Sequence, residues 1–407
     1  MDKTQSLYDA LSKVEGFIYP NEISLNWDML IVMYPYITGL VAGAFILASL
    51  NRVFNIKALR PTYELSLLAA LSFMLVATMP LIVHLGQPFR FYEMLVTPHF
   101  TSAMALFGFV YLWYLMVVLL LEIWFDYRYD MVIWSQQKKG VMKYVYKVLT
   151  LGISDTSDQS RKVDEKIGYF ITVVGIPSAF LLHGYVGFIF GAIKANPWWS
   201  SVMMPVIFLF SAMVSGIALI MFIYMLVTVI RKQKIDMNAL DTIGKYLFYI
   251  LILDFSLESL DQIHRIYVAD ESFDILKILV HGKLFVTFFI IQLGLGTIVP
   301  LAALAFLQFK KPSEKVRKIM YATISVLVLA GIFYMRYNVV IGGQLFSKSF
   351  YGFTSYKANV LYDFDALLSL ILFILPFLIL AFLLWLLPPW KKSENLIKGT
   401  GESLSGD

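Results

Sequence analysis

The sequence predicts an all-α protein that crosses a membrane about nine times, and three observations support this fold class. Of its 407 residues, 59 % are hydrophobic and only 15 % are charged, whereas a soluble globular chain carries about 25 % charged residues. Apolar runs of about 20 residues, the length of a membrane-spanning helix, recur along the chain. The loops between these runs alternate between rich and poor in lysine and arginine, which is the orientation signal of membrane proteins. A transmembrane β-barrel is excluded, because its strands would be about 10 residues of alternating polarity.

The apolar runs define the spans. Lysine and arginine gather in the loops after the first, third, fifth and seventh runs and in the C-terminal tail, whereas the alternate loops hold few. This alternation predicts that the N-terminus lies outside and the tail lies in the cytoplasm. The predicted spans are approximately residues 27–50, 64–86, 101–125, 167–192, 201–230, 244–266, 279–308, 317–340 and 367–388.

The spans form one predicted membrane domain, residues 27–388. It follows an extracytoplasmic segment, residues 1–26, which lacks the pattern of a cleavable signal peptide, and it precedes a cytoplasmic tail, residues 389–407. Two connections within the domain are long, a cytoplasmic loop at about 126–166 and an external loop at about 341–366.

The sixth span carries more ionisable side chains than an apolar span normally holds. Asp254, Glu258, Asp261 and Arg265 are spaced i, i+4, i+7 and i+11, so they share one helical face, and His264 adjoins them. The predicted orientation places Asp254 near mid-membrane and the others progressively closer to the outer face. Charges at mid-helix cost about 2.5–3.5 kcal/mol each on insertion scales, and they usually face a bundle interior or a cavity. We therefore interpret this face as a carboxylate ladder that passes protons.

Other spans place polar groups at the same outer level, which predicts one site near the outer face. The alternative is that such residues cap helix ends or extend to the interface. It applies most to Arg265, His281 and Lys283, and least to Asp254 and Glu258, which lie too deep. The outer groups are Asn26 and Asp28 at the start of the first span, His84 at the end of the second with Gln87 and Arg90 after it, His183 and Tyr185 in the fourth, His281 and Lys283 in the seventh, and Arg336 and Asn338 in the eighth.

The inner half of the membrane holds fewer polar groups, Glu64 and Glu122. Together with Asp254, Glu258 and Asp261 they form the candidate proton path from the cytoplasmic side. No cysteine is present, so the chain can hold neither a disulfide nor a cysteine-ligated iron–sulfur cluster. The histidines show no haem attachment motif and no clustered metal-ligand spacing, and we predict no haem and no metal in this chain.

Small residues recur in the first and fifth spans. Pro35, Gly39 and Gly43 in the first resemble Pro205, Ser211 and Ser215 in the fifth. The pattern is compatible with an internal repeat of four spans, or with small residues that let membrane helices pack closely.

Several stretches resemble a known family. They are MYPYITGLVAGAFILASL (33–50), HLGQPFRFYEML (84–95), GIPSAFLLHGYVGFIFGAIKANPWW (175–199) with PVIFLFSAMVSGIAL (205–219), and RYNVVIGGQLFSKS (336–349). These stretches resemble the NrfD / polysulfide reductase C family of integral membrane subunits. The last stretch, with the extra span, resembles the longer members typified by the DsrP subunit of the DsrMKJOP complex.

The resemblance implies two four-helix bundles plus an extra C-terminal helix in the cytoplasmic (inner) membrane. It also implies a menaquinone or other quinone site near the outer face, an external ferredoxin-like iron–sulfur subunit, and further cytochrome or catalytic subunits. In shorter relatives a tyrosine of the fourth span contacts the quinone, and Tyr185 occupies that position in HGYVG. The family's LGRP is LGQP here, with Gln87 in place of arginine and Arg90 nearby.

The resulting hypothesis is a quinone-interacting subunit of a respiratory oxidoreductase rather than a stand-alone enzyme. A quinone needs an apolar slot for its tail and polar groups at its carbonyls. Tyr185 is predicted to orient the ring, with His183, His84, Arg90 and Arg265 as further binding residues, and Asp261, His264 and Glu258 as the groups that exchange protons. Two other interpretations stay open, a secondary transporter or proton channel that uses the ladder, and a passive anchor for a redox partner; no feature indicates nucleic-acid binding.

Overall fold

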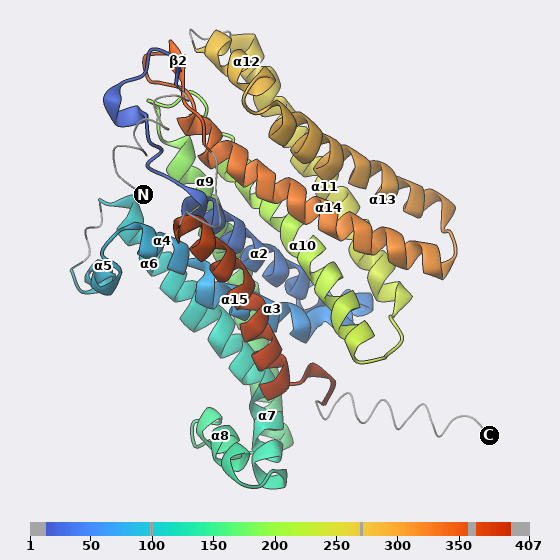
Figure 1. The fold of residues 1–407 in the computed structure, drawn as a ribbon. Coiled ribbons are helices and arrows are strands. Elements are labelled where there is room, and N and C mark those ends of the chain that lie inside the picture. Colours follow the sequence, from blue (N-terminus) through green and yellow to red (C-terminus); the bar gives the residue numbers. More distant parts are fainter. Residues whose placement is uncertain (1–13, 98, 100, 269–271, 357–363, 392–407) are drawn as a thin grey trace.

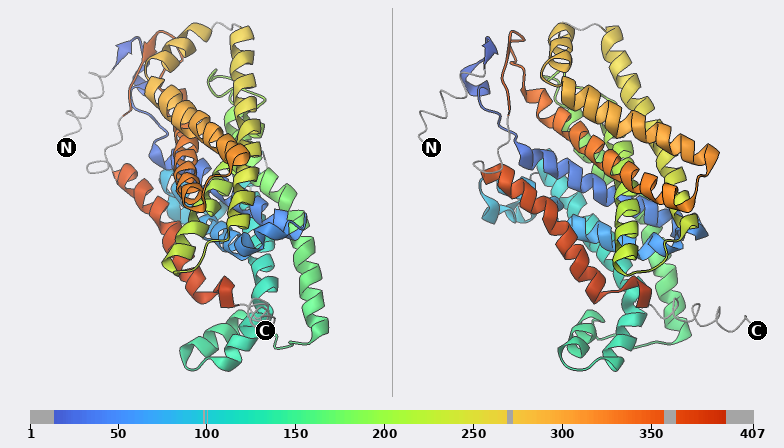
Figure 2. Two further views of the ribbon diagram at one scale, coloured as in Figure 1. Left: turned by 90° about the vertical axis from the view of Figure 1, so that its right-hand side faces the viewer. Right: turned by 45° about the vertical axis from the view of Figure 1, so that its right-hand side comes forward.

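The structure of the protein is a computed structural model that describes residues 14–97, 99, 101–268, 272–356 and 364–391. Its architecture is a set of long helices with a small two-stranded sheet at one end (Figures 1 and 2). The predicted all-α fold class is confirmed. The elements of the N-terminal half are β1 (Glu15–Gly16), η1 (Pro20–Glu22), α2 (Met29–Arg52), η2 (Lys57–Thr62), α3 (Tyr63–Ala77), α4 (Met79–His84), η3 (Pro88–Arg90), α5 (Glu93–Val96), α6 (Ala103–Trp113), the π-helical η4 (Tyr114–Leu120), α7 (Leu121–Gln137), α8 (Val141–Leu149) and α9 (Asp158–Gly191).

The C-terminal half repeats the pattern of long antiparallel helices. Its elements are α10 (Met204–Ile230), α11 (Met237–Val268), α12 (Phe273–His281), the π-helical η5 (Phe285–Ile298), α13 (Val299–Lys310), α14 (Glu314–Val340), η6 (Gly342–Gln344), β2 (Gly352–Phe353), α15 (Phe364–Leu386) and η7 (Pro389–Lys391).

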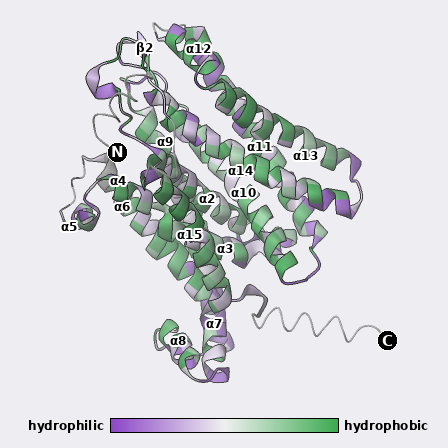
Figure 3. Ribbon diagram, in the orientation of Figure 1, coloured by the Kyte–Doolittle hydropathy of each residue, from purple (hydrophilic) through white to green (hydrophobic). Residues whose placement is uncertain are grey.

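The helices group into two bundles and one additional helix. The first bundle contains α2, α3, α9 and the continuous helix α6–η4–α7. The second contains α10, α11, α14 and the continuous helix η5–α13. Helices α2 and α10 pack against each other at the centre, and α15 lies against α3 and α2. Hydrophobic residues cover the helices and hydrophilic residues gather toward their ends (Figure 3), as expected for a multi-pass membrane protein.

Eight helical segments in the described part of the chain are long and apolar enough to cross a membrane, and they coincide with eight of the nine predicted spans. The remaining predicted span, residues 244–266, lies within α11. This helix has 32 residues and packs along α10 and α13, but its charged face makes it less apolar than the others.

The long connection predicted at about 126–166 is largely helical. Helix α7 continues to Gln137, and α9 begins at Asp158, where the Ser157 side chain caps it by accepting a hydrogen bond from the Ser160 amide. The hydropathy pattern missed these extensions because they carry the polar residues expected of helix ends outside the hydrocarbon region.

Small residues allow the two bundles to approach closely. A side chain at Gly43 of α2 would lie 2.2 Å from the Ala212 carbonyl oxygen of α10, and one at Gly216 would lie 2.4 Å from the Gly43 backbone. The small residues that suggested a repeat therefore serve helix packing between the bundles, as such residues commonly do in membranes.

We expect Gly43→Leu to destabilise the protein by about 3 kcal/mol or more, because backbone atoms of α10 occupy the space that the leucine needs. The loss is measured as a lower unfolding temperature of the purified protein in detergent. Gly184→Ala is the control, since a side chain there meets only the Pro205 carbonyl oxygen, at 3.9 Å. Equal unfolding temperatures for the two variants would contradict the role of Gly43.

Candidate functional site

A cavity of about 460 Å³ opens in the second bundle, between α11, α12, η5 and α14. Most of its wall is apolar and aromatic. Its polar residues include Glu258, Asp261 and Arg265, which are three of the residues that the sequence pattern selected. The apolar wall includes Trp198, Phe255, Phe273, Phe288, Phe289 and Met335.

One wall of the cavity carries a chain of polar side chains from three helices. The Asn338 side-chain amide of α14 donates a hydrogen bond to Gln292 Oε1 of η5 at 2.8 Å. The Gln292 amide in turn donates to Glu258 Oε2 of α11 at 3.2 Å. Gln292 and Asn338 are buried, so this chain fixes the orientation of the Glu258 carboxyl at the cavity wall.

At the end of the cavity next to the loop between α9 and α10, Asp261 and Arg265 form an ion pair, with Arg265 Nε 2.9 Å from Asp261 Oδ2. Ser201 Oγ donates a hydrogen bond to Asp261 Oδ1 at 2.5 Å, and Arg265 Nη1 donates to the Pro197 carbonyl oxygen at 2.6 Å. The pair thereby joins α11 to the loop between α9 and α10. Asp261 is therefore matched with a cation, whereas Glu258 accepts a hydrogen bond from the neutral amide of Gln292.

A buried arginine lies at the centre of the molecule, where the two bundles meet. Arg336 of α14 is fully buried. Its Nη2 lies 3.1 Å from His183 Nε2 of α9 and donates to Ser211 Oγ of α10 at 2.7 Å. Asp254 and Glu258 of α11 are close enough to interact with it electrostatically. Buried charges are costly unless they are matched, and the electrostatic interaction with Asp254 and Glu258 offsets part of the cost of burying Arg336.

The structure separates Tyr185 from His183, although both were predicted in one site. Two residues apart on a helix differ by about 200° in direction. His183 therefore faces Arg336 at the bundle interface, while Tyr185 faces the first bundle and stacks on Phe107, with ring centres 6.1 Å apart. His84 also belongs to the first bundle, where its Nδ1 lies 3.8 Å from Asp28 Oδ1.

Two other predicted site residues lie away from the cavity. Arg90 is exposed and forms a two-pronged ion pair with Glu93, at 2.8 and 2.9 Å. His264 is exposed on α11 and is absent from the lining of the cavity. His281 of α12 does line the cavity, although its role was not assigned from the sequence.

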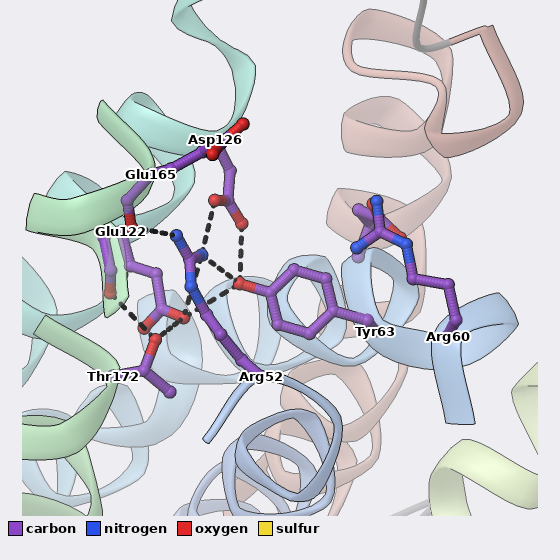
Figure 4. A network of polar contacts seen from close by, with 9 residues as sticks. Arg52, Arg60, Tyr63, Glu122, Asp126, Glu165 and Thr172 are labelled. Carbon is purple, nitrogen blue, oxygen red and sulfur yellow. Dashed lines mark hydrogen bonds and ion pairs between the residues drawn. The ribbon is translucent and has the colours of Figure 1, made fainter. Parts of the chain in front are cut away.

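Glu122 lies in a separate polar network in the first bundle (Figure 4). It is fully buried and accepts hydrogen bonds from Thr172 Oγ1 at 2.6 Å and from the Tyr63 hydroxyl at 3.1 Å. Asp126 accepts from the same hydroxyl at 2.7 Å and from Arg52 Nη1. The network borders a pocket of about 320 Å³ lined by Arg52, Tyr63 and Asp126.

Glu64 lies beside this network on α3, with Arg60 Nη2 3.3 Å from its carboxylate. The candidate proton path is thus divided between the bundles, with Glu64 and Glu122 in the first and Asp254, Glu258 and Asp261 in the second.

Gln292 had no predicted role, and Arg336 and Asn338 were predicted only to lie at the same outer level as the other polar groups. The signal that could have selected them is a polar side chain inside an apolar span, which often marks a functional site. The spacing within each helix could not show that these three residues meet α11, because they come from other helices.

Comparison with known proteins identifies the family. Residues 20–348 match the model of the family described as Polysulphide reductase, NrfD. The chain is 29 % identical to the C subunit of the selenate reductase of Mesobacillus selenatarsenatis over 323 residues, which cover 78 % of this chain and 73 % of that protein. It is 26 % identical to a protein of Halobacterium salinarum named as a dimethyl sulfoxide reductase membrane subunit, over 78 % of this chain and 69 % of that protein.

A further relative is protein NrfD of Escherichia coli, 29 % identical over 205 residues, which cover 48 % of this chain and 58 % of that protein. Two of the three relatives are named as subunits of reductases, which fits a membrane protein that works with redox partners. Because the family match covers residues 20–348 of a multi-pass helical fold, which is most of the 407 residues, the chain belongs to the NrfD / polysulphide reductase family of membrane proteins.

Proposed function

We propose that this protein is the quinone-interacting membrane subunit of a multisubunit oxidoreductase. The observation that carries this proposal is the largely apolar cavity in the second bundle, which has the half-buried carboxyl of Glu258 on its wall. An apolar slot with a few convergent polar groups is the usual form of a site for an aromatic cofactor. The family membership and the reductase subunits among its relatives agree with this function.

The residues of the cavity fit a quinone ring. Aromatic side chains such as Phe288 and Phe289 supply apolar walls, and a volume of about 460 Å³ lies within the range of small-molecule sites. Gln292 and Asn338 can donate hydrogen bonds to a ring carbonyl, and Glu258 can take or give its proton. When bound, a quinone supplies the exchange of two electrons and two protons. The chain's own residues orient the ring, exclude water and hold the proton at the Glu258 carboxyl.

The electron partner that we propose is an external iron–sulfur subunit with ferredoxin-type clusters. The chain contains no cysteine, so cysteine-ligated clusters must belong to another subunit. We further propose menaquinone as the quinone and the cytoplasmic (inner) membrane as the location. The resemblance of residues 336–349 to the longer DsrP-type members supports sulfur compounds as the terminal substrates.

The test is quinone extraction from the gently purified complex, combined with identification of the subunits that purify with it. We expect about one bound quinone per chain and a partner that carries several iron–sulfur clusters. A complex with the iron–sulfur partner but no quinone would favour the passive-anchor interpretation. A chain with neither would favour a transporter that uses Asp254 and Glu258.

Tyr185 provides a test of where the quinone binds. If the ring lies in the first bundle, as the family resemblance implies, Tyr185→Phe should lower quinol-linked turnover about tenfold or more by removing the hydroxyl that orients it. If the ring lies in the cavity of the second bundle, turnover should stay near that of the parent. Tyr169→Phe, at the opposite end of the same helix, is the matched control, and the presence of all partner proteins is checked for both variants.

A further inference from the structure

The short helix α8 and its flanks, residues 138–153, carry a strong positive charge. This segment contains Lys138, Lys139, Lys143 and Lys147 and no acidic residue. None of the four lysines forms an ion pair with another residue in the described part of the chain. The positive charge is therefore available to a ligand outside the chain.

One face of α8 is fixed to the membrane domain. The Tyr146 hydroxyl donates a hydrogen bond to the Leu386 carbonyl oxygen at 2.8 Å, and Trp124 Nε1 donates to the Leu149 carbonyl oxygen at 2.9 Å. The Tyr146 ring also packs against Trp134, with ring centres 5.4 Å apart. These contacts hold α8 in one orientation, so its remaining faces have fixed directions relative to the membrane domain.

The exposed side of α8, away from Tyr146, combines apolar and basic residues. Val141, Tyr144, Val148 and, just beyond the helix, Leu151 have exposed fractions of 67–77 %. On the helix, Val141, Tyr144 and Val148 share one face because they are spaced i, i+3 and i+7. Lys143 and Lys147, spaced i and i+4, lie beside that face. An apolar face bordered by lysines is typical of helices that lie in a membrane interface.

The position of α8 agrees with such an interface. Its hydrogen bond to Leu386 places it at the end of α15, the last apolar helix (Figure 1). Trp385, one residue earlier, is exposed, and Arg231 lies over the ring of Trp390, 3.7 Å from its centre. Tryptophan and arginine at helix ends mark the boundary between hydrocarbon and headgroups. The Tyr146 side of α8 lies beside this end of α15, and Val141, Tyr144 and Val148 lie on the opposite side of the helix.

We propose that residues 138–153 form a binding site for anionic phospholipids of the adjacent leaflet. In this site Val141, Tyr144 and Val148 contact the acyl-chain boundary, and the four lysines attract the phosphate groups. The fixed orientation of α8 lets the lysines act together on the anionic surface. The site is independent of the quinone proposal, since it lies at the opposite end of the first bundle from Tyr185 and outside the cavity of the second.

The test uses the purified complex in lipid nanodiscs, with a fluorescent amino acid incorporated at position 148. Spin-labelled phosphatidylglycerol or spin-labelled phosphatidylcholine is added as the same minor fraction of a neutral bilayer, and fluorescence quenching is compared. We expect the anionic lipid to quench about threefold or more strongly than the neutral one. The variant with Lys138, Lys139, Lys143 and Lys147 changed to glutamine should show equal quenching by both lipids.

A second variant removes the same number of positive charges at other positions, with glutamine at Lys232, Lys234, Lys310 and Lys311. It should keep the stronger quenching by the anionic lipid that the parent shows. Equal quenching by both lipids in the parent would overturn the proposal. Quenching by aqueous iodide and by neither lipid would show that the face is in water. Protection from iodide and from both lipids would show that another protein covers it, and either result also overturns the proposal.

Discussion

Quinol-linked electron transfer should fall about 10²- to 10⁴-fold when Glu258 is replaced by glutamine, the usual range for loss of a proton-transferring group. The amide keeps the size of the carboxyl and can still accept the hydrogen bond that Gln292 donates at 3.2 Å. It cannot take a proton from a quinol in the cavity. We therefore expect the complex to assemble normally. Proton transfer from the quinol should become slow, and stopped-flow measurements of the purified complex should show a lower rate of quinol oxidation.

The control for this prediction is Glu314→Gln, in the first turn of α14. Glu314 pairs with Lys318 and lies outside both bundles' polar networks, so turnover should stay within about twofold of the parent. Unchanged turnover of Glu258→Gln, with quinone still bound, would exclude proton exchange at Glu258. A simultaneous loss in Tyr185→Phe would then place the reaction in the first bundle.

Replacing Arg336 with methionine should lower the free energy of unfolding by about 3–5 kcal/mol, the usual cost of removing one partner from a buried charge network. The guanidinium contacts His183, Ser211 and the Phe208 carbonyl oxygen and interacts with Asp254. Methionine fills much of the same volume but satisfies none of these groups. The effect is measured as a lower unfolding temperature in detergent, with complex assembly followed in parallel.

A second variant separates lost charge matching from lost packing. The double variant Arg336→Met, Asp254→Asn removes both charges and should recover part of the stability lost in the single variant. Arg161→Met removes an arginine from a partly exposed pair with Glu165 and should cost little. Two results together would show that Arg336 does not offset the charge of the carboxylates of α11. The first is a loss of unfolding free energy for Arg336→Met that is no larger than the loss for Arg161→Met. The second is no recovery of stability in the double variant.

Relations within a single helix could be predicted from the sequence because helical geometry fixes them. The i, i+4 spacing of Asp261 and Arg265 predicted a common face, and the two side chains form an ion pair at 2.9 Å. Asp254 and Asp261 are both buried on that face, as predicted, while His264 is exposed. His264 was predicted to adjoin that face, but it is directed to the exposed side of α11, while the next residue, Arg265, turns toward Asp261.

Relations between helices could not be predicted in this way. In a soluble helix the apolar stripe shows which side faces the core. Here most faces of each span are apolar, since lipid and protein interior are equally hydrophobic. The rotation of each helix about its axis was therefore not determined by hydropathy, so the sequence did not show that His183 faces Arg336 while Tyr185 faces Phe107.

The sequence by itself determined the membrane class, the approximate spans, the family, and the face of α11 that carries Asp254, Glu258 and Asp261, because hydrophobic length and helical period are local properties of the chain. Only the tertiary structure decided which groups meet that face: Arg336 near Asp254, Gln292 and Asn338 at the cavity, and Ser201 at Asp261. These contacts depend on how α10, η5 and α14 are rotated and packed against α11, which the local pattern of apolar residues leaves unspecified.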